Sequence, residues 1–309
     1  MTVTFRQLGS SFVAEVSPID LREVHDRETL DAIRDGMDRY GVLVFRNQPF
    51  TDKEQLAFAQ RWDGTLHTKT GVSALMKNRL GDDPVGDISN VGPDGEILNA
   101  DDRRRMYSLA NRLWHTDASF QDPPGRYSML SARVVPPVSA DTEFADMREA
   151  YDALDDGTKK MLEGLHVHHS IAYSRQTLGF HFSEEEQEKL KGAVHDIVRT
   201  NPRTKRRSLY IASHATRIVE WRVAEGRLLL IDLMTHATQP QFVYRHQWQK
   251  DDLVIWDQRC TNHNALGDFD RRTQARRLEK TTVPGTTPVG RVYHDTTGAR
   301  NLTHGFTYY

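Results

Sequence analysis

Residues 113–120 read Leu-Trp-His-Thr-Asp-Ala-Ser-Phe and begin the segment that indicates the fold class most clearly. From there to residue 144 the sequence consists of short segments that are interrupted by two Pro-Pro pairs. Such segments predict short β-strands, because β-branched and aromatic residues favour strands and proline interrupts them. Residues 241–248, 253–256 and 276–283 predict further strands in the C-terminal third.

The N-terminal third has signals for two helices and one strand. Apolar residues near helical spacing predict a helix over 27–39, and the apolar residues 42–45 predict a buried strand. Thr51 followed by Glu54 forms a capping box, which predicts a helix from there to about residue 62. The polar residues 63–106 predict a long loop. Further helices are predicted at 147–154, 158–165, 183–191 and 224–237.

The order of these elements indicates the fold class. The strands stand on both sides of a helical insertion and do not alternate with helices, which argues against a doubly wound parallel sheet. The pattern predicts a mainly β protein with flanking helices, either a closed antiparallel barrel or a jelly roll. Neither a repeat nor a linker divides the sequence, so we predict a single domain over residues 1–309.

Composition narrows the class of protein. The net charge of -2, with both signs interspersed, argues against nucleic acid as a partner. No apolar run approaches the roughly 20 residues of a membrane span, and the first residues lack the layout of a signal peptide. Cys260 is the single cysteine and can form no internal disulfide, which suits a reducing compartment. These features predict a cytoplasmic protein.

The segment 113–120 also carries a candidate metal site. His115 and Asp117 are two residues apart, and on a strand their side chains point to the same face. His263 follows the predicted strand 253–256 and is the candidate third ligand. Two imidazoles and one carboxylate leave three open positions around a metal, as in non-haem Fe(II) oxygenases. A second histidine cluster at 166–169 is interpreted as part of a strand and of the surface.

Residues 271–280 contain four arginines and could hold an anion. Arginine binds a carboxylate through two parallel hydrogen bonds. Alternation along a strand places Arg276 and Lys280 on one face, and Arg277 and Glu279 on the other. Taken by itself, this run is interpreted more simply as a solvated charged segment.

Several ordered blocks together resemble a known family. The sequence resembles the family of Fe(II)/2-oxoglutarate enzymes that includes taurine dioxygenase and 2,4-dichlorophenoxyacetate dioxygenase (TauD/TfdA), and its aryloxyalkanoate branch in particular. The resemblance covers nearly the whole chain, and the blocks that carry it are residues 19–22, 41–46, 111–117, 126–130, 141–144, 151–154, 236–238 and 256–263.

This resemblance implies a fold, cofactors and roles for particular residues. It implies a double-stranded β-helix, which is a cupin-like jelly roll, and Fe(II) bound by His115, Asp117 and His263. It also implies 2-oxoglutarate as co-substrate with O₂, its far carboxylate being held by Thr142 and Arg276. The spacing from His263 to Arg276 is about two residues longer than is usual in the family. Arginines 271, 272 and 277 therefore remain open as alternatives.

The resemblance further implies a small anionic organic substrate, with an aryloxyalkanoate-like carboxylic acid as the leading expectation. Lys69, Asn111 and Lys280 stand where relatives contact the substrate. Hydroxylation of the ether would give a hemiacetal that breaks down, with release of succinate and CO₂. The alternatives are a sulfonate or alkyl-sulfate dioxygenase, a jelly-roll binding protein without catalysis, and a zinc hydrolase. A homo-oligomer is expected.

Overall fold

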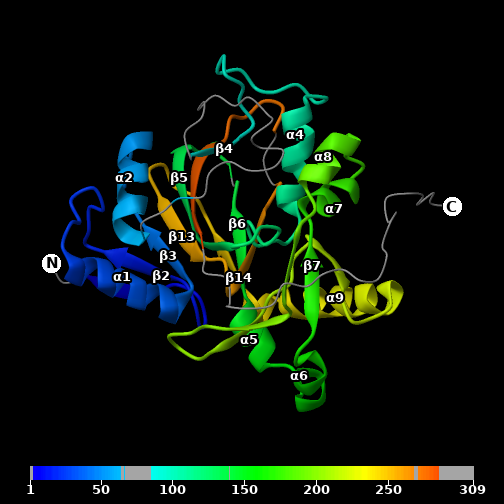
Figure 1. Cartoon of the computed structure of the whole chain (residues 1–309). Helices are drawn as coiled ribbons and strands as arrows, with labels where there is room; N and C mark the ends of the chain where they lie inside the picture. Colours follow the sequence, from blue (N-terminus) through cyan, green and yellow to red (C-terminus); the bar gives the residue numbers. More distant parts are fainter. Residues whose placement is uncertain (1–2, 64–65, 67–84, 139, 268–270, 285–309) are drawn as a thin grey trace.

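The computed structural model describes residues 3–63, 66, 85–138, 140–267 and 271–284. Its largest sheet has the strand order β1-β2-β3-β13-β5-β15-β4 (Figure 1). Neighbouring strands in this sheet are antiparallel except for β2 and β3, which are parallel. The strands are β1 Thr4–Gln7, β2 Ala14–Ser17, β3 Val42–Phe45, β13 Leu253–Asp257, β5 Gly125–Val134, β15 Arg277–Pro284 and β4 Gly86–Ser89.

Three smaller sheets accompany the large one. The first has the order β12-β6-β14, the second β11-β7-β8, and the third pairs β10 with β9. All pairs within them are antiparallel. Their strands are β6 Thr142–Asp146, β12 Val243–His246, β14 Thr261–Ala265, β7 His166–His169, β8 Ala193–Asp196, β9 Val198–Thr200, β10 Arg207–Leu209 and β11 Ala215–Ile218.

Helices α1 (Arg27–Tyr40) and α2 (Asp52–Asp63) cover one face of the large sheet. Asp26 caps α1 by accepting a hydrogen bond from the Thr29 amide, and Gly41 ends it with φ 71°. Thr51 and Glu54 form the predicted capping box at the start of α2. The two helices bury apolar side chains against the sheet in a core that includes Leu43, Phe45, Met129 and Ile255. Both predicted helices are confirmed.

The opposite face of the large sheet packs against the β12-β6-β14 sheet. Val44, Val254 and Leu278 of the large sheet share a core with Phe144 of β6. Strand β3 is therefore buried on both faces, which explains why residues 42–45 are all apolar. The candidate metal site lies at this junction, because strand β14 carries His263.

The remaining helices lie around the smaller sheets, as Figure 1 shows. Helix α9 packs with α5 against strands of the smaller sheets in a further apolar core. The part of the chain that the structure describes contains no helix long and apolar enough to span a membrane. These helices are α4 Arg103–Ser108, α5 Met147–Asp152, α6 Asp156–Leu162, α7 Ile171–Gln176, α8 Glu184–Lys189 and α9 Val223–Ala237, with 3₁₀ turns at Leu109–Arg112 and Pro240–Phe242.

Several sequence predictions need correction. The predicted loop 63–106 contains strand β4 and the start of helix α4. Residues 113–120 do not form a strand, because His115 makes an isolated bridge to His263 and a turn follows it. Strands β8 to β11 and helix α7 were not predicted because they are short, and β8 and β11 also depend on pairing with β7, which is distant in sequence. The histidines of β7 lie on a strand as predicted, but His166 and His169 are buried rather than on the surface.

Candidate metal centre

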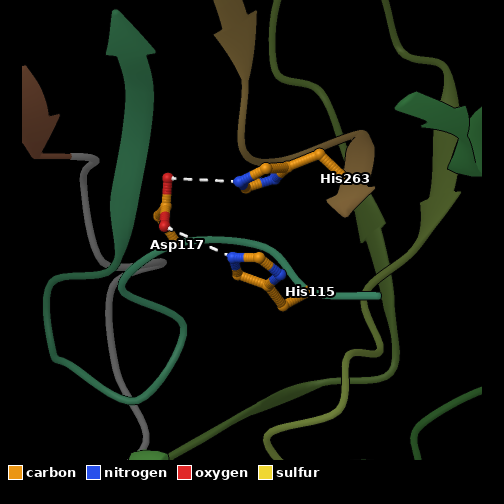
Figure 2. Close-up of side chains that lie close together, drawn as sticks. All are labelled: His115, Asp117 and His263. Atoms are coloured by element: carbon orange, nitrogen blue, oxygen red, sulfur yellow. Dashed lines mark ion pairs between the residues drawn. The ribbon is translucent and has the colours of Figure 1, made fainter. Parts of the chain in front are cut away.

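His115, Asp117 and His263 converge on one point between the two facing sheets. Their ligand atoms all lie within 4.8 Å of one another, and no other group of His, Cys, Asp or Glu side chains in the described residues could hold a metal in this way. Figure 2 shows each imidazole pointing toward one oxygen of the carboxylate. His115 Nε2 lies 3.9 Å from Asp117 Oδ1, and His263 Nε2 lies 3.8 Å from Asp117 Oδ2.

A backbone bridge brings the two histidines together. The His115 amide donates to the His263 carbonyl at 3.0 Å, and the His263 amide returns the bond at 2.8 Å. His263 sits on β14 opposite Phe144 of β6. The chain turns directly after Asp117, where Ala118 has φ 57°. The two side chains of the His-x-Asp pair thus meet as predicted, although by a bridge and a turn rather than by a regular strand.

Both imidazoles are neutral at neutral pH, which is the form that binds a metal. Nδ1 of His115 donates to the Leu113 carbonyl at 2.7 Å, which leaves the lone pair of Nε2 facing the site. Burial lowers the pKa of His115 to about 4, and the nearby cations Arg175 and Lys280 act in the same direction. Burial also lowers the pKa of His263 well below its usual value. Neither ring needs to lose a proton at neutral pH before it binds a metal.

Asp117 is held in place by several hydrogen bonds. Its Oδ2 accepts from Gln258 Nε2 at 2.9 Å and from the Ser128 hydroxyl at 3.0 Å, while Oδ1 accepts from Lys280 Nζ at 2.9 Å. Burial opposes ionisation of this carboxyl, but Lys280 and the two histidines outweigh it and hold its pKa below the usual range. The carboxylate is therefore ionised and fixed in orientation.

This donor set fits a divalent transition metal. Two neutral imidazoles and one carboxylate are the ligands that non-haem Fe(II) oxygenases use on one face of the metal. A closed structural zinc site would need a fourth protein ligand. The three side chains could thus hold Fe(II) with positions left for other ligands.

A buried guanidinium beside the large sheet and a hydroxyl from the β12-β6-β14 sheet approach each other near the triad. Arg276, just before β15, is 7% exposed, and its Nη2 lies 3.4 Å from Thr142 Oγ1 on β6. The Thr142 oxygen also accepts from Trp248 Nε1 at 3.0 Å. Because Thr142 accepts both hydrogen bonds at its oxygen, its hydroxyl proton can be donated to a ligand. Arg276 and Thr142 could together bind a carboxylate.

The other arginines of this run lie elsewhere. Arg277 points to the opposite face of β15, where its Nη2 pairs with Glu279 at 2.7 Å. Arg272 is exposed. The backbone carbonyl of Arg271 accepts from Asn90 Nδ2 at 3.0 Å. Of the four arginines considered from sequence, Arg276 is the one that is buried next to Thr142.

The three residues expected to contact substrate differ in their placement. Lys280 projects to the site but donates to Asp117, as described above. Asn111 lies in the 3₁₀ turn before His115, and its Oδ1 accepts from Arg175 Nη2 at 3.2 Å. Lys69 lies outside the described residues. Sequence reasoning did not single out Gln258, Ser128 or Arg175, because only tertiary contacts bring them to the site.

Comparisons with known proteins agree with this geometry. The family model described as "Taurine catabolism dioxygenase TauD, TfdA family" matches residues 4–282. The chain is 43% identical over 279 residues to the alpha-ketoglutarate-dependent 2,4-dichlorophenoxyacetate dioxygenase of Cupriavidus pinatubonensis, with 90% of this chain and 97% of the relative covered. It is 35% identical over 267 residues to the (S)-phenoxypropionate/alpha-ketoglutarate-dioxygenase of Sphingobium herbicidovorans, with 84% of this chain and 87% of the relative covered.

A solved structure is similar over nearly the same length. The crystal structure of AAD-2 in complex with Mn(II) and N-oxalylglycine superposes with a TM-score of 0.85 at 44% identity, covering 94% of this chain and 100% of that one. The chain is thus similar to a protein whose structure was solved with a bound divalent metal. On these grounds the chain belongs to the TauD/TfdA family and is a dioxygenase that depends on Fe(II), 2-oxoglutarate and O₂.

Proposed function

We propose that this enzyme hydroxylates aryloxyalkanoate acids at the carbon next to the ether oxygen. The net reaction consumes one C–H bond, O₂ and 2-oxoglutarate, and yields the hydroxylated substrate, succinate and CO₂. The product of an aryloxyacetate is a hemiacetal, which breaks down to a phenol and glyoxylate. Iron with its bound co-substrate supplies the oxidising chemistry, and the protein supplies ligands, orientation and exclusion of water.

The roles proposed for the metal ligands and for the co-substrate site rest on contacts described above, and those for substrate binding rest on the family resemblance. His115, Asp117 and His263 are proposed to bind Fe(II), with Gln258 and Ser128 fixing the carboxylate. Arg276 and Thr142 are proposed to bind the far carboxylate of 2-oxoglutarate. Asn111, Lys280 and Lys69 are proposed to lie near the acid group of the substrate.

One observation carries this proposal: the metal triad and the carboxylate-binding pair share one junction between the two sheets. Thr142 and Phe144 are two residues apart on β6, so their side chains lie on the same face. Phe144 lies opposite His263 in the pairing of β6 with β14, and the two rings are 6.0 Å apart. A small keto acid could therefore reach both a metal at the triad and the guanidinium of Arg276.

The assignment of the two sheets to a jelly roll is also a proposal. We propose that the two facing sheets form a double-stranded β-helix, because consecutive strands are distributed between them. The chain runs from β5 in the large sheet to β6 and β12 in the small one, then to β13 in the large, β14 in the small and β15 in the large. The family match runs without interruption from residue 4 to 282, which supports a single domain.

A sulfate ester is the second candidate substrate. The alkylsulfatase of Acinetobacter baylyi is 29% identical over 283 residues, with 88% of this chain and 83% of the relative covered. The aryloxyalkanoate relatives are more similar to this chain, at 35% to 43% identity. We therefore rank the carboxylic acid first.

A direct comparison of substrates tests this ranking. The purified enzyme, with Fe(II), 2-oxoglutarate and air, is supplied with 2,4-dichlorophenoxyacetate, phenoxypropionate, an alkyl sulfate or a sulfonate, and succinate is measured. We expect kcat/KM to be about tenfold or more higher for the aryloxyalkanoates. A higher value for the sulfate ester would contradict the proposed substrate class. No substrate-dependent succinate with any aryloxyalkanoate would reject the proposed function.

Localisation in the cytoplasm and assembly into a homo-oligomer remain predictions. The single cysteine, Cys260, is buried and unpaired, which is compatible with a reducing compartment. Light scattering on the purified protein would test the assembly.

A further inference from the structure

Helix α7 places a buried cation beside the candidate metal centre. The Arg175 side chain is 4% exposed. It interacts electrostatically with His115 and Asp117, so it lies near the proposed iron ligands. A series of contacts also connects Arg175 with His115. Arg175 Nη1 donates to the Ser174 hydroxyl at 2.9 Å, and His214 Nδ1 contacts the same oxygen at 2.9 Å. The His214 ring in turn lies 5.8 Å from the His115 ring.

Among the described residues, no carboxylate forms an ion pair with Arg175, although Asp117 and Tyr107 favour its charged form electrostatically. Its Nη1 and Nη2 donate to neutral oxygens, those of Ser174 and Asn111, and its Nε is buried without a hydrogen-bond partner. The Tyr107 ring lies 4.7 Å from its Cζ, but burial raises the pKa of this phenol, which stays neutral. Burial without a carboxylate partner costs stability, and accordingly the pKa of Arg175 itself is lowered.

Asp117 cannot serve as that missing partner. Its Oδ1 accepts from Lys280, and its Oδ2 accepts from Gln258 and Ser128. Arg276 and Thr142 offer a separate site for the far carboxylate of the co-substrate. Arg175 is therefore available to pair with an anionic group of another ligand.

The residues around Arg175 could contact both the carboxylate and the aromatic ring of an aryl acid. Asn111 Oδ1 accepts from Arg175, which fixes the amide and leaves Nδ2 as its donor group. Tyr107 and Phe120 belong to an apolar cluster with Ile171, and the Phe120 ring lies 5.2 Å from His214. Donors for a carboxylate thus adjoin aromatic side chains that can contact an aryl ring.

We infer that Arg175, oriented by Asn111 and Ser174, binds the carboxylate of the prime substrate. Asn111 donates to the same group through Nδ2. Lys280 then acts mainly on Asp117, to which it is bound. This inference rests on the proposed function, and it assigns recognition of the acid group to a residue of helix α7.

The test compares an aryloxyacetate with its uncharged methyl ester. The ratio of kcat/KM for acid over ester is measured in wild type, Arg175→Gln, Arg175→Lys and Asn111→Asp. Loss of a charge-assisted hydrogen bond should lower the ratio about 10- to 100-fold in Arg175→Gln. Arg175→Lys should keep part of the preference because it keeps the charge. The KM for 2-oxoglutarate should be unchanged in Arg175→Gln, since Arg276 is intact.

Asn111→Asp provides a second, independent variant. The new carboxylate would lie beside the Arg175 guanidinium and pair with it. This variant should therefore fold, and its ratio of kcat/KM for acid over ester should also fall. Arg199→Gln is the matched control, because it removes a guanidinium that lies 4.6 Å from the Tyr210 ring, a contact of the same kind as that of Arg175 with Tyr107. If Arg175→Gln does not fold, the result for Asn111→Asp decides.

Failure of the inference can be told apart from failure of the proposed function. An unchanged ratio in folded Arg175→Gln, or in Asn111→Asp, overturns the inference while wild type still prefers the acid. An equal loss in Arg199→Gln also overturns it. If wild type turns over no aryloxyalkanoate at all, the proposed function fails and the inference falls with it.

Discussion

Asp117 is the side chain on which most contacts of the site converge. Two histidines face its two oxygens, and Gln258, Ser128 and Lys280 donate hydrogen bonds to them. Without a metal, this carboxylate is compensated mainly by the ammonium of Lys280. A bound divalent cation would share that role, so metal binding should weaken the pairing between Lys280 and Asp117.

The proposed iron ligands can be tested one at a time. His263→Ala should lose most iron affinity and reduce turnover by several orders of magnitude, since no other described side chain can replace the lost nitrogen. Equilibrium dialysis against Fe(II), together with succinate formation, checks this. His236→Ala on α9 is the control, because His236 Nε2 contacts the Ala150 carbonyl at 2.8 Å and is not one of the three proposed ligands. Iron binding by His263→Ala that equals wild type would remove His263 from the site.

Arg276 should control affinity for the co-substrate. Arg276→Ala removes the buried guanidinium next to Thr142, and we expect the KM for 2-oxoglutarate to rise about 30-fold or more, as for a one-sided loss of a charged pair. Arg277→Ala should change this KM little, because Arg277 pairs with Glu279 on the other face of β15. Steady-state assays with varied 2-oxoglutarate measure both. A larger effect in Arg277→Ala would show that the two residues are assigned the wrong way round.

At the scale of elements, the turn between β13 and β14 organises the site. Gln258 stands in this turn and makes four side-chain contacts: Oε1 accepts from the Asp117 amide and the Thr116 hydroxyl, each at 2.7 Å, and Nε2 donates to Asp117 Oδ2 and the Ser128 hydroxyl. The same turn leads into the strand that carries His263. One short connection thereby fixes two of the three proposed ligands.

Gln258→Leu should therefore weaken the metal site without removing a ligand. We expect a loss of about 10- to 100-fold in iron affinity, as is typical when a group that orients a ligand is lost. Unfolding should become easier by about 1–3 kcal/mol, because buried polar partners lose their hydrogen bonds. Thermal unfolding and dialysis measure the two effects, with the exposed Gln241→Leu as control. If metal affinity stays at the wild-type value, Gln258 does not orient Asp117.

Sequence predicted the elements whose signals are local. Helices α1 and α2 were found from their caps and apolar spacing, and strand β3 from its unbroken apolar run. Strands β8 to β11 escaped prediction because they are short, and β8 and β11 also depend on pairing with β7, which is distant in sequence. For the same reason Arg175 was missed: its contact with Asn111 joins residues 64 positions apart.

At the scale of the whole molecule, two facing sheets bring distant ligands together. His115 and Asp117 precede β5, while His263 lies on β14 near the other end of the described chain. The three could be named together from sequence because His115 and Asp117 are two residues apart and the ordered blocks resembled a known family. Their distances, and the contacts of Lys280 and Gln258 with Asp117, required the folded chain.

The central claim is that this protein is an oxygenase that couples 2-oxoglutarate to substrate, and not a hydrolase with similar ligands. The most direct test supplies ¹⁸O₂ to the enzyme with Fe(II), 2-oxoglutarate and 2,4-dichlorophenoxyacetate, and analyses succinate and phenol by mass spectrometry. We predict equal amounts of succinate and phenol, with one labelled oxygen atom in each succinate. Release of phenol without O₂, or succinate without label, would contradict the account.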